Sequence, residues 1–133
     1  MASSYTTRLR FDKQGTGDNS GSWGTVLNTL FDLLDEAVAG METVSTTGGT
    51  TTLTANNGAD DQARNAILKI TGVLVSNSTI EVPAVSKEYI VWNATTGDFT
   101  VTVKVTGQTG IAVTQGKRMF LFCDGTDVYS PIT

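Results

Sequence analysis

Residues 88–105 have the sequence Glu-Tyr-Ile-Val-Trp-Asn-Ala-Thr-Thr-Gly-Asp-Phe-Thr-Val-Thr-Val-Lys-Val, and this stretch decides the fold class of the chain. In its second half, apolar residues at 99, 101, 103 and 105 alternate with Thr, Thr and Lys. Successive side chains of a strand point to opposite faces of a sheet. The alternation therefore predicts a half-buried antiparallel strand.

Similar short apolar runs lie on both sides of this stretch. They are separated by Gly, Asn, Ser or Pro, which are residues typical of turns. The strands expected in this way are 50–55, 65–71, 79–82, 89–93, 99–105 and 119–122. Their spacing predicts a β module over residues 41–133, built as an antiparallel sandwich, a barrel-like fold or a stacked β-fold of short strands.

The pattern changes to a helical one at residues 23–40. Apolar residues recur at the i, i+3, i+4, i+7 and i+11 spacing that marks one face of an amphipathic helix: Leu27, Leu30, Phe31, Leu34 and Val38. Ser22 is suited to cap its N-terminus, and Gly40 is suited to end it. Four further apolar residues widen the face, so we expect this helix to pack on two sides: Trp23, Val26, Leu33 and Ala37.

Residues 1–22 are polar and rich in Gly, with one candidate short strand at 5–11. The segment has too little apolar content to fold alone, so it predicts an extended docking arm. The chain thus divides into an arm (1–22), an amphipathic helix (23–40) and a β module (41–133). The overall fold class is mainly β with one N-terminal amphipathic helix.

Composition narrows the possible partners and the cellular compartment. The net charge is −4, and the only near-cluster of basic residues, at 8–13, is interrupted by Asp12, which disfavours nucleic acid as a partner. No apolar run is long enough to predict membrane insertion. The single Cys123 cannot form an intrachain disulfide, and the N-terminus lacks the pattern of a secretory signal. We expect synthesis in a reducing cytosol and a buried Cys123 thiol.

Catalytic chemistry is not expected. The chain has no His, which removes the commonest general base and metal ligand. Two groups of carboxylates, 60–61 and 32–36, have spacings that paired-carboxylate hydrolysis could use, but solvated turns and helix faces explain them better. Asp124-Gly125-Thr126 predicts a tight turn in preference to a calcium loop. The sequence predicts no enzyme activity, no cofactor and no metal.

Several strand aromatics leave a sugar-binding function open, because exposed aromatic rings can stack on sugars. Core packing is the more frequent role of aromatics that alternate along a strand. The residues concerned are Tyr89, Trp92, Phe120, Phe122 and Tyr129.

A family resemblance covers nearly the whole chain. Residues 5–10 (Tyr-Thr-Thr-Arg-Leu-Arg), 15–28 and 33–40 resemble the opening of small tail-fibre-like structural proteins of tailed bacteriophages. The segments 63–72, 82–93 and 121–126 are similar to the rest of that pattern. The resemblance implies a virion component that is made in the host bacterial cytoplasm and is typically homotrimeric. It fixes no site residues, and it does not distinguish tail fibres from head fibres or capsid-decorating proteins.

Together with the residue pattern, the resemblance gives a functional hypothesis. The chain is expected to be a tail or adsorption fibre component that docks to other virion proteins through its arm and helix. The alternatives are a head fibre or capsid decoration protein, or a module that recognises a host surface glycan or protein through the turns at 93–97, 107–110 and 124–129. The expected assembly residues are Tyr5, Leu9, Phe11, Trp23, Leu27, Leu30, Phe31, Leu34 and Val38.

Overall fold

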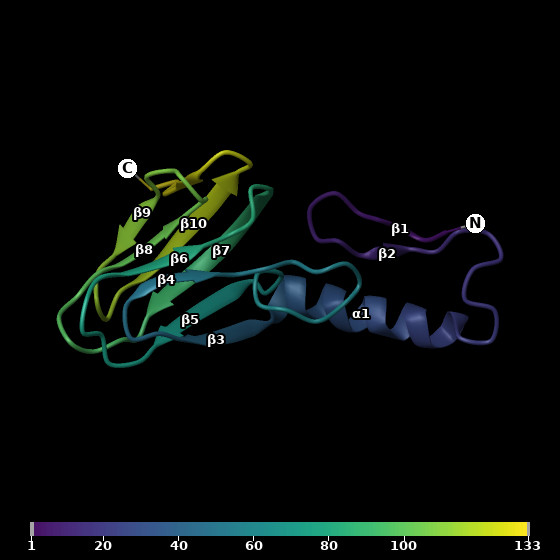
Figure 1. The fold of residues 1–133 in the computed structure, drawn as a ribbon, viewed down its shortest axis with the longest axis horizontal. Helices are drawn as coiled ribbons and strands as arrows, with labels where there is room; N and C mark the ends of the chain where they lie inside the picture. The colour runs from purple at the N-terminus through teal and green to yellow at the C-terminus, as the bar shows by residue number, and fades with distance from the viewer. Residues whose placement is uncertain (1, 133) are drawn as a thin grey trace.

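The structure, a computed structural model, describes residues 2–132 and is mainly β with one helix in that range. This confirms the predicted fold class. Figure 1 shows an elongated arrangement, in which the β module occupies one end and the helix, with a small hairpin beside it, occupies the other. The helix leads directly into the first strand of the β module.

The N-terminal segment is a hairpin, which corrects the prediction of an extended arm. Strand β1 (Ser4–Tyr5) pairs antiparallel with β2 (Asp12–Lys13). Between them, the Thr6 N–H donates to the Phe11 carbonyl at 2.9 Å, and Arg10 takes a positive φ of 56° that turns the chain. Composition alone missed this fold because the hairpin is stabilised by contacts with residues 56–64, far along the sequence.

Helix α1 (Trp23–Ala39) begins and ends where the sequence predicts, but its ends are formed differently. Ser22 occupies the N-cap position without a capping side-chain bond, and its hydroxyl donates to the Asn19 carbonyl. Gly40 has an extended backbone with φ −72°, so the helix ends without a left-handed residue. A Cβ at Gly40 would clash with the side chain of Asn65 and with the Glu36 carbonyl, and this close approach accounts for the glycine.

The β module is a sandwich of two sheets. The larger sheet has five strands in the spatial order β11 (Val128–Tyr129), β10 (Arg118–Asp124), β7 (Ser86–Asn93), β5 (Ile67–Thr71) and β3 (Met41–Ser45). The smaller sheet has four in the order β4 (Gly49–Thr52), β6 (Ser78–Glu81), β8 (Val101–Lys104) and β9 (Ile111–Val113).

From β3 to β8 the chain alternates between the two sheets, so that it winds as a short solenoid. Neighbouring turns of the solenoid pair in parallel: β3 with β5, β5 with β7, β4 with β6, and β6 with β8. The expectation of antiparallel pairing holds for the C-terminal strands β9, β10 and β11 and is wrong for these four pairs. Alternating hydrophobicity indicates which face of a strand is buried, but it does not indicate whether the neighbouring strand runs parallel or antiparallel.

Stacked corners connect the two sheets at one end of the solenoid. The Leu74 N–H donates to the Thr96 carbonyl at 2.8 Å, and the Thr96 N–H donates to the Gly72 carbonyl at 3.0 Å. Gly72 and Gly97 have positive φ angles of 121° and 108°, and a Cβ on either would collide with a carbonyl of the preceding turn. The corners therefore require glycine for both conformation and space.

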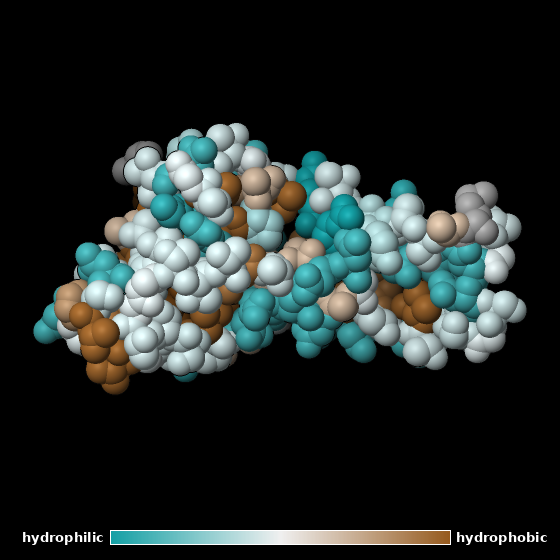
Figure 2. Space-filling view, viewed as in Figure 1, coloured by the Kyte–Doolittle hydropathy of each residue, from teal (hydrophilic) through white to brown (hydrophobic). Residues whose placement is uncertain are grey.

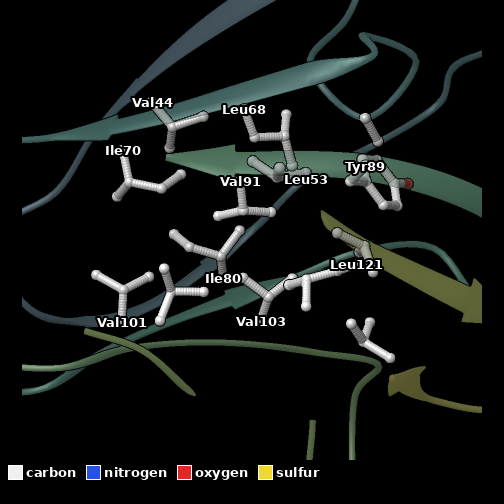
Figure 3. Close-up of a cluster of buried hydrophobic side chains, with 14 of the residues drawn as sticks. Val44, Leu53, Leu68, Ile70, Ile80, Tyr89, Val91, Val101, Val103 and Leu121 are labelled. Carbon is white, nitrogen blue, oxygen red and sulfur yellow. The ribbon is translucent and has the colours of Figure 1, made fainter. Parts of the chain in front are cut away.

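The hydrophobic core lies between the two sheets (Figure 3). Inward-facing residues of the large sheet, such as Leu68 and Val91, meet Ile80 and Val103 of the small sheet, and all four are fully buried. The aliphatic face predicted for residues 99–105 is thus the core face of β8.

Candidate assembly surface

Helix α1 carries two apolar stripes, and of the two sides on which it is expected to pack, the structure shows a contact for one. The first faces the chain's own hairpin: Val26, Leu30 and Leu33 line a cavity of about 140 Å³ together with Asp12 and Gly58. Leu33 is the buried residue of the helix. This stripe has its partner within the chain.

The second stripe has no cover within the described chain. It consists of Trp23, Phe31, Leu34 and Val38, whose exposed fractions are 55%, 56%, 45% and 74%. At about 100° per residue, these positions lie next to the first stripe around the helix. We call them the outer stripe. Four large exposed apolar side chains on one helix are unusual for a solvated surface.

An exposed apolar row crosses the outer face of the five-stranded sheet. Met41 pairs with Ile67, Ile67 with Ile90, and Ile90 with Phe120, so the four residues lie side by side on adjacent strands. Met41, Ile90 and Phe120 are exposed, and Ile67 is half-buried. We call these four residues the apolar row.

The outer stripe and the apolar row meet at a hollow. A cavity of about 690 Å³ is lined by Val38 from the helix and by Ile90 and Phe120 from the row. Arg8 and Leu9 from the hairpin line it as well. The two apolar features are therefore parts of one continuous surface, which we call the assembly surface.

Two cations border the apolar row on the next register line of the same sheet face. Lys69 pairs with Trp92, and Trp92 pairs with Arg118. The Lys69 ammonium lies 4.5 Å from the centre of the Trp92 ring, and the Arg118 guanidinium lies 4.1 Å from it. These are cation–π distances. The ring thus holds both positive charges beside the row.

A buried arginine that the sequence analysis did not single out ties the hairpin to the β module. Arg64 is fully buried, and its guanidinium donates to the carbonyls of Leu9, Asn56 and Ala59 at 2.7–2.8 Å. It also forms a salt bridge of 3.2 Å with Asp61. Three of these four partners belong to the 56–61 loop, and the fourth belongs to the hairpin. Nothing in the local sequence around Arg64 distinguishes it from a solvated residue.

The electrostatics of Asp61 reflect this buried setting. Burial raises the pKa of the Asp61 carboxyl, although the Asn56 backbone N–H and the Arg64 charge both favour its ionised form. Removing only one partner of a buried ion pair strongly destabilises the fold, because the other charge is left buried and unpaired. Arg64 and Asp61 therefore fix the hairpin through a coupled network.

The structure separates the nine predicted assembly residues into two groups. Tyr5, Leu9 and Phe11 contact their own chain: Arg10 lies over the Tyr5 ring, Arg64 lies over the Phe11 ring, and the Leu9 carbonyl accepts from Arg64. The helix residues divide further, because Leu30 lines the internal cavity and Leu27 is half-buried. Trp23, Phe31, Leu34 and Val38 form the outer stripe.

The remaining candidate residues have structural roles. Cys123 is a free, buried thiol, as predicted, and burial raises its pKa. The Asp124 carboxylate accepts the N–H groups of Thr126 and Asp127 at 2.8 and 3.1 Å, which confirms the predicted tight turn. Within residues 2–132, no group of three or more His, Cys, Asp or Glu side chains is placed to hold a metal ion.

Of the carboxylates considered for hydrolysis, Glu36 and Asp60 lie near each other. Burial and the neighbouring carboxylate of Asp60 raise the pKa of Glu36. Asp32 and Asp35 are exposed on the helix. Asp61 is held by Arg64, so its charge is already engaged in the fold.

The three turns expected to contact a receptor lie at two ends of the sandwich. Asp124 pairs with Ser86 at the start of β7, whereas Asn93 lies at the end of the same strand. The 107–110 turn joins the Asp124 end, because the Asp127 carboxylate accepts the N–H groups of Thr109 and Gly110. The turns therefore do not form one binding surface.

Comparisons of the chain with family models, with curated proteins and with solved structures give no match. No helix in the described part of the chain combines the length and the hydropathy needed to cross a membrane. The function must therefore be inferred from the sequence pattern and from the assembly surface.

Proposed function

We propose that this protein is a structural component of a bacteriophage virion, a tail or adsorption fibre subunit that assembles as a homotrimer. The observation that carries the proposal is the outer stripe of α1, which leaves four large apolar side chains in contact with water. Exposed apolar patches of this kind mark protein–protein contacts. The sequence resemblance to small tail-fibre-like proteins supplies the class of particle.

The shape of the chain supports this proposal. Figure 1 places the β module and the helix at opposite ends of an elongated molecule. A second exposed apolar pair, Val73 and Val75, follows β5, in the corner that leads to the small sheet. Figure 2 shows a brown cluster at the end of the β module away from the helix. A subunit with contacts at both ends suits a linear assembly.

The hairpin changes the expected docking residues. The Tyr5 and Phe11 rings lie against Arg10 and Arg64, and the Leu9 carbonyl accepts from Arg64, so these residues belong to a folded hairpin and not to an unfolded arm. In the proposal, docking to other virion proteins therefore depends on the folded helix and hairpin together.

The alternatives make different use of the same features. A head fibre or capsid decoration protein would use the same assembly surface at another place on the particle. A glycan-binding module needs free aromatic faces, but Tyr89 is buried and cations lie over the Trp92 ring. Phe120 and Tyr129 remain exposed, and Phe120 belongs to the apolar row. This arrangement favours assembly over sugar binding.

Antibody labelling of purified particles of the phage that encodes the chain tests the proposal. Electron microscopy is expected to show label at the tail. Label on the capsid would support the head-fibre or decoration alternative instead. Particles without the chain, judged by labelling and by mass spectrometry of their proteins, would refute a virion role.

A further inference from the structure

We propose that the outer stripe of α1 in one copy packs on the apolar row of the five-stranded sheet in the next copy. This inference rests on the self-assembly in the proposed function, and it adds the two surfaces that meet. The partner is a second copy of this chain, and the contact is helix on sheet. The sheet thus becomes half of the interface, which the helical pattern alone does not indicate.

Both halves of the proposed contact are uncovered within the described chain. Phe31, Leu34 and Val38 are exposed on the helix, and Ile90 and Phe120 are exposed on the sheet. The hollow of about 690 Å³ at the edge of the row offers space for a side chain of an incoming helix. A contact that buried only one of the two features would leave the other in water.

Charge selects the helix of a second copy as the occupant of the row. The helix contains Asp32, Asp35 and Glu36 and no basic residue. Asp35 follows Phe31 by four positions, so its carboxylate borders the outer stripe. No ion pair within residues 2–132 engages Asp35, Lys69 or Arg118.

The acidic border of the outer stripe therefore complements the basic border of the apolar row, formed by Lys69 and Arg118. A bundle of helices packed stripe to stripe would bring Asp35 side chains together without any cation on the helix to oppose them. Like charges at an interface disfavour an arrangement, and opposite charges fix its register. The helix-on-sheet contact is the arrangement that pairs these charges.

In the proposed arrangement the contact is heterologous: each copy places its outer stripe on one neighbour and receives the outer stripe of a different neighbour on its own apolar row. Head-to-tail contacts of this type generate rings when the rotation closes. In a closed ring of three copies, the proposed homotrimer, every outer stripe is paired with an apolar row.

Cysteine cross-linking distinguishes helix-on-sheet packing from a helix bundle. The full-length variants Leu34→Cys and Phe120→Cys are produced separately and also together in the same cells, then treated with a mild oxidant. Cys123 is buried and is present in every sample, so the wild-type chain controls for it. We expect a covalent dimer only where the two variants are produced together.

Three other results have distinct meanings. Efficient cross-linking of Leu34→Cys with itself would show helix against helix and overturn the inference. An oligomer that forms with no cross-link in the mixed sample would overturn it as well, while leaving self-assembly intact. A wild-type chain that light scattering shows to be monomeric at every concentration would contradict the self-assembly in the proposed function itself.

Charge reversal gives an independent test. Asp35→Lys is expected to weaken association by roughly two- to fivefold, as is the double variant Lys69→Glu/Arg118→Glu. Combining the three substitutions in one chain should restore most of the lost strength of association. Asp32→Lys is the matched control, because Asp32 lies further round the helix from the outer stripe. Failure of the combined variant to recover would contradict the proposed pairing of charges.

Discussion

The β module and the N-terminal lobe, residues 2–40, bury their apolar side chains to very different extents. The buried core cluster consists of residues from Val44 onward, with both sheets contributing. Helix α1 contributes one buried apolar side chain, Leu33. A helix of 17 residues gains most of its stability from packing of its apolar face.

This difference indicates separate tasks for the two regions. The β module completes its own core, so it provides a rigid body. The N-terminal lobe is held in place by the Arg64 network and keeps its outer stripe uncovered. The lobe is therefore the region that has most to gain from a partner.

The largest effect is expected at a corner of the solenoid. Gly72→Ala places a Cβ against the Thr46 carbonyl at a φ of 121°, so the free energy of unfolding should fall by about 3–5 kcal/mol. Gly116→Ala is the control: its φ is also positive, but no atom lies within 4 Å of the added Cβ. We expect the control to cost about 1–2 kcal/mol in urea unfolding. Equal losses would show that corner stacking is unimportant.

A smaller effect on the β module, but a large one on the lobe, is expected from Arg64→Met. The substitution removes the buried donor that serves Asp61 and the carbonyls of Leu9, Asn56 and Ala59, which should lower the free energy of unfolding by about 3 kcal/mol. Limited proteolysis should then cut the hairpin while the β module resists. Arg118→Met, at an exposed site, should change neither measurement in the dissociated chain. Uniform resistance in Arg64→Met would show that the hairpin is held by other contacts.

Asp127→Asn should cost about 1–3 kcal/mol, because the buried carboxylate accepts N–H groups from Val105, Thr109 and Gly110. Burial opposes ionisation, but these bonds prevail and lower the pKa of Asp127 below its ordinary value. Its contribution is therefore present above about pH 4 and is lost as the pH falls towards the folded-state pKa. When the free energy of unfolding is measured at decreasing pH, it should fall less steeply in the variant than in the wild type. If the free energy of unfolding falls equally steeply with pH in both proteins, the stabilising role of the Asp127 carboxylate is contradicted.

The last effect, which appears only at alkaline pH, concerns Lys87 at the end of the sandwich. Burial lowers the pKa of Lys87 to about 8, and the charge of Glu88 only partly opposes this. The unfolded chain then binds the proton more tightly, so this contribution to stability rises between pH 8 and about pH 10.

Comparison with Lys87→Met isolates this effect, because Cys123 titrates in both proteins. The wild type should gain stability relative to the variant as the pH rises across that window, measured by urea unfolding at several pH values. If the difference in free energy of unfolding between the two proteins stays constant across this pH range, the lowered pKa of Lys87 is refuted.

The sequence predicted the elements that have strong local patterns. The helix at 23–39 and the buried face of β8 follow from spacing alone. Strand β3 (Met41–Ser45) was missed, because its Thr-rich sequence becomes a strand only by pairing with β5. Pairing direction was missed for the same reason, since it depends on residues about 25 positions apart.

One signal for the solenoid was present in the sequence. Thr-Gly occurs at 47–48, 71–72 and 96–97, so it recurs after 71 − 47 = 24 and 96 − 71 = 25 residues. Repeats of this length are typical of stacked architectures. No comparable signal marks Arg64 or the apolar row, because both depend on side chains brought together from distant segments.

Light scattering on the full-length chain tests the central claim that the lobe is where copies join. The wild type is expected to have the mass of a trimer, and Phe31→Asp/Leu34→Asp the mass of a monomer, because carboxylates on the outer stripe prevent its burial. Thr25→Asp/Asn28→Asp adds the same charge on the exposed polar face and should keep the wild-type mass. A trimer that survives Phe31→Asp/Leu34→Asp would contradict the claim, as would a wild-type monomer.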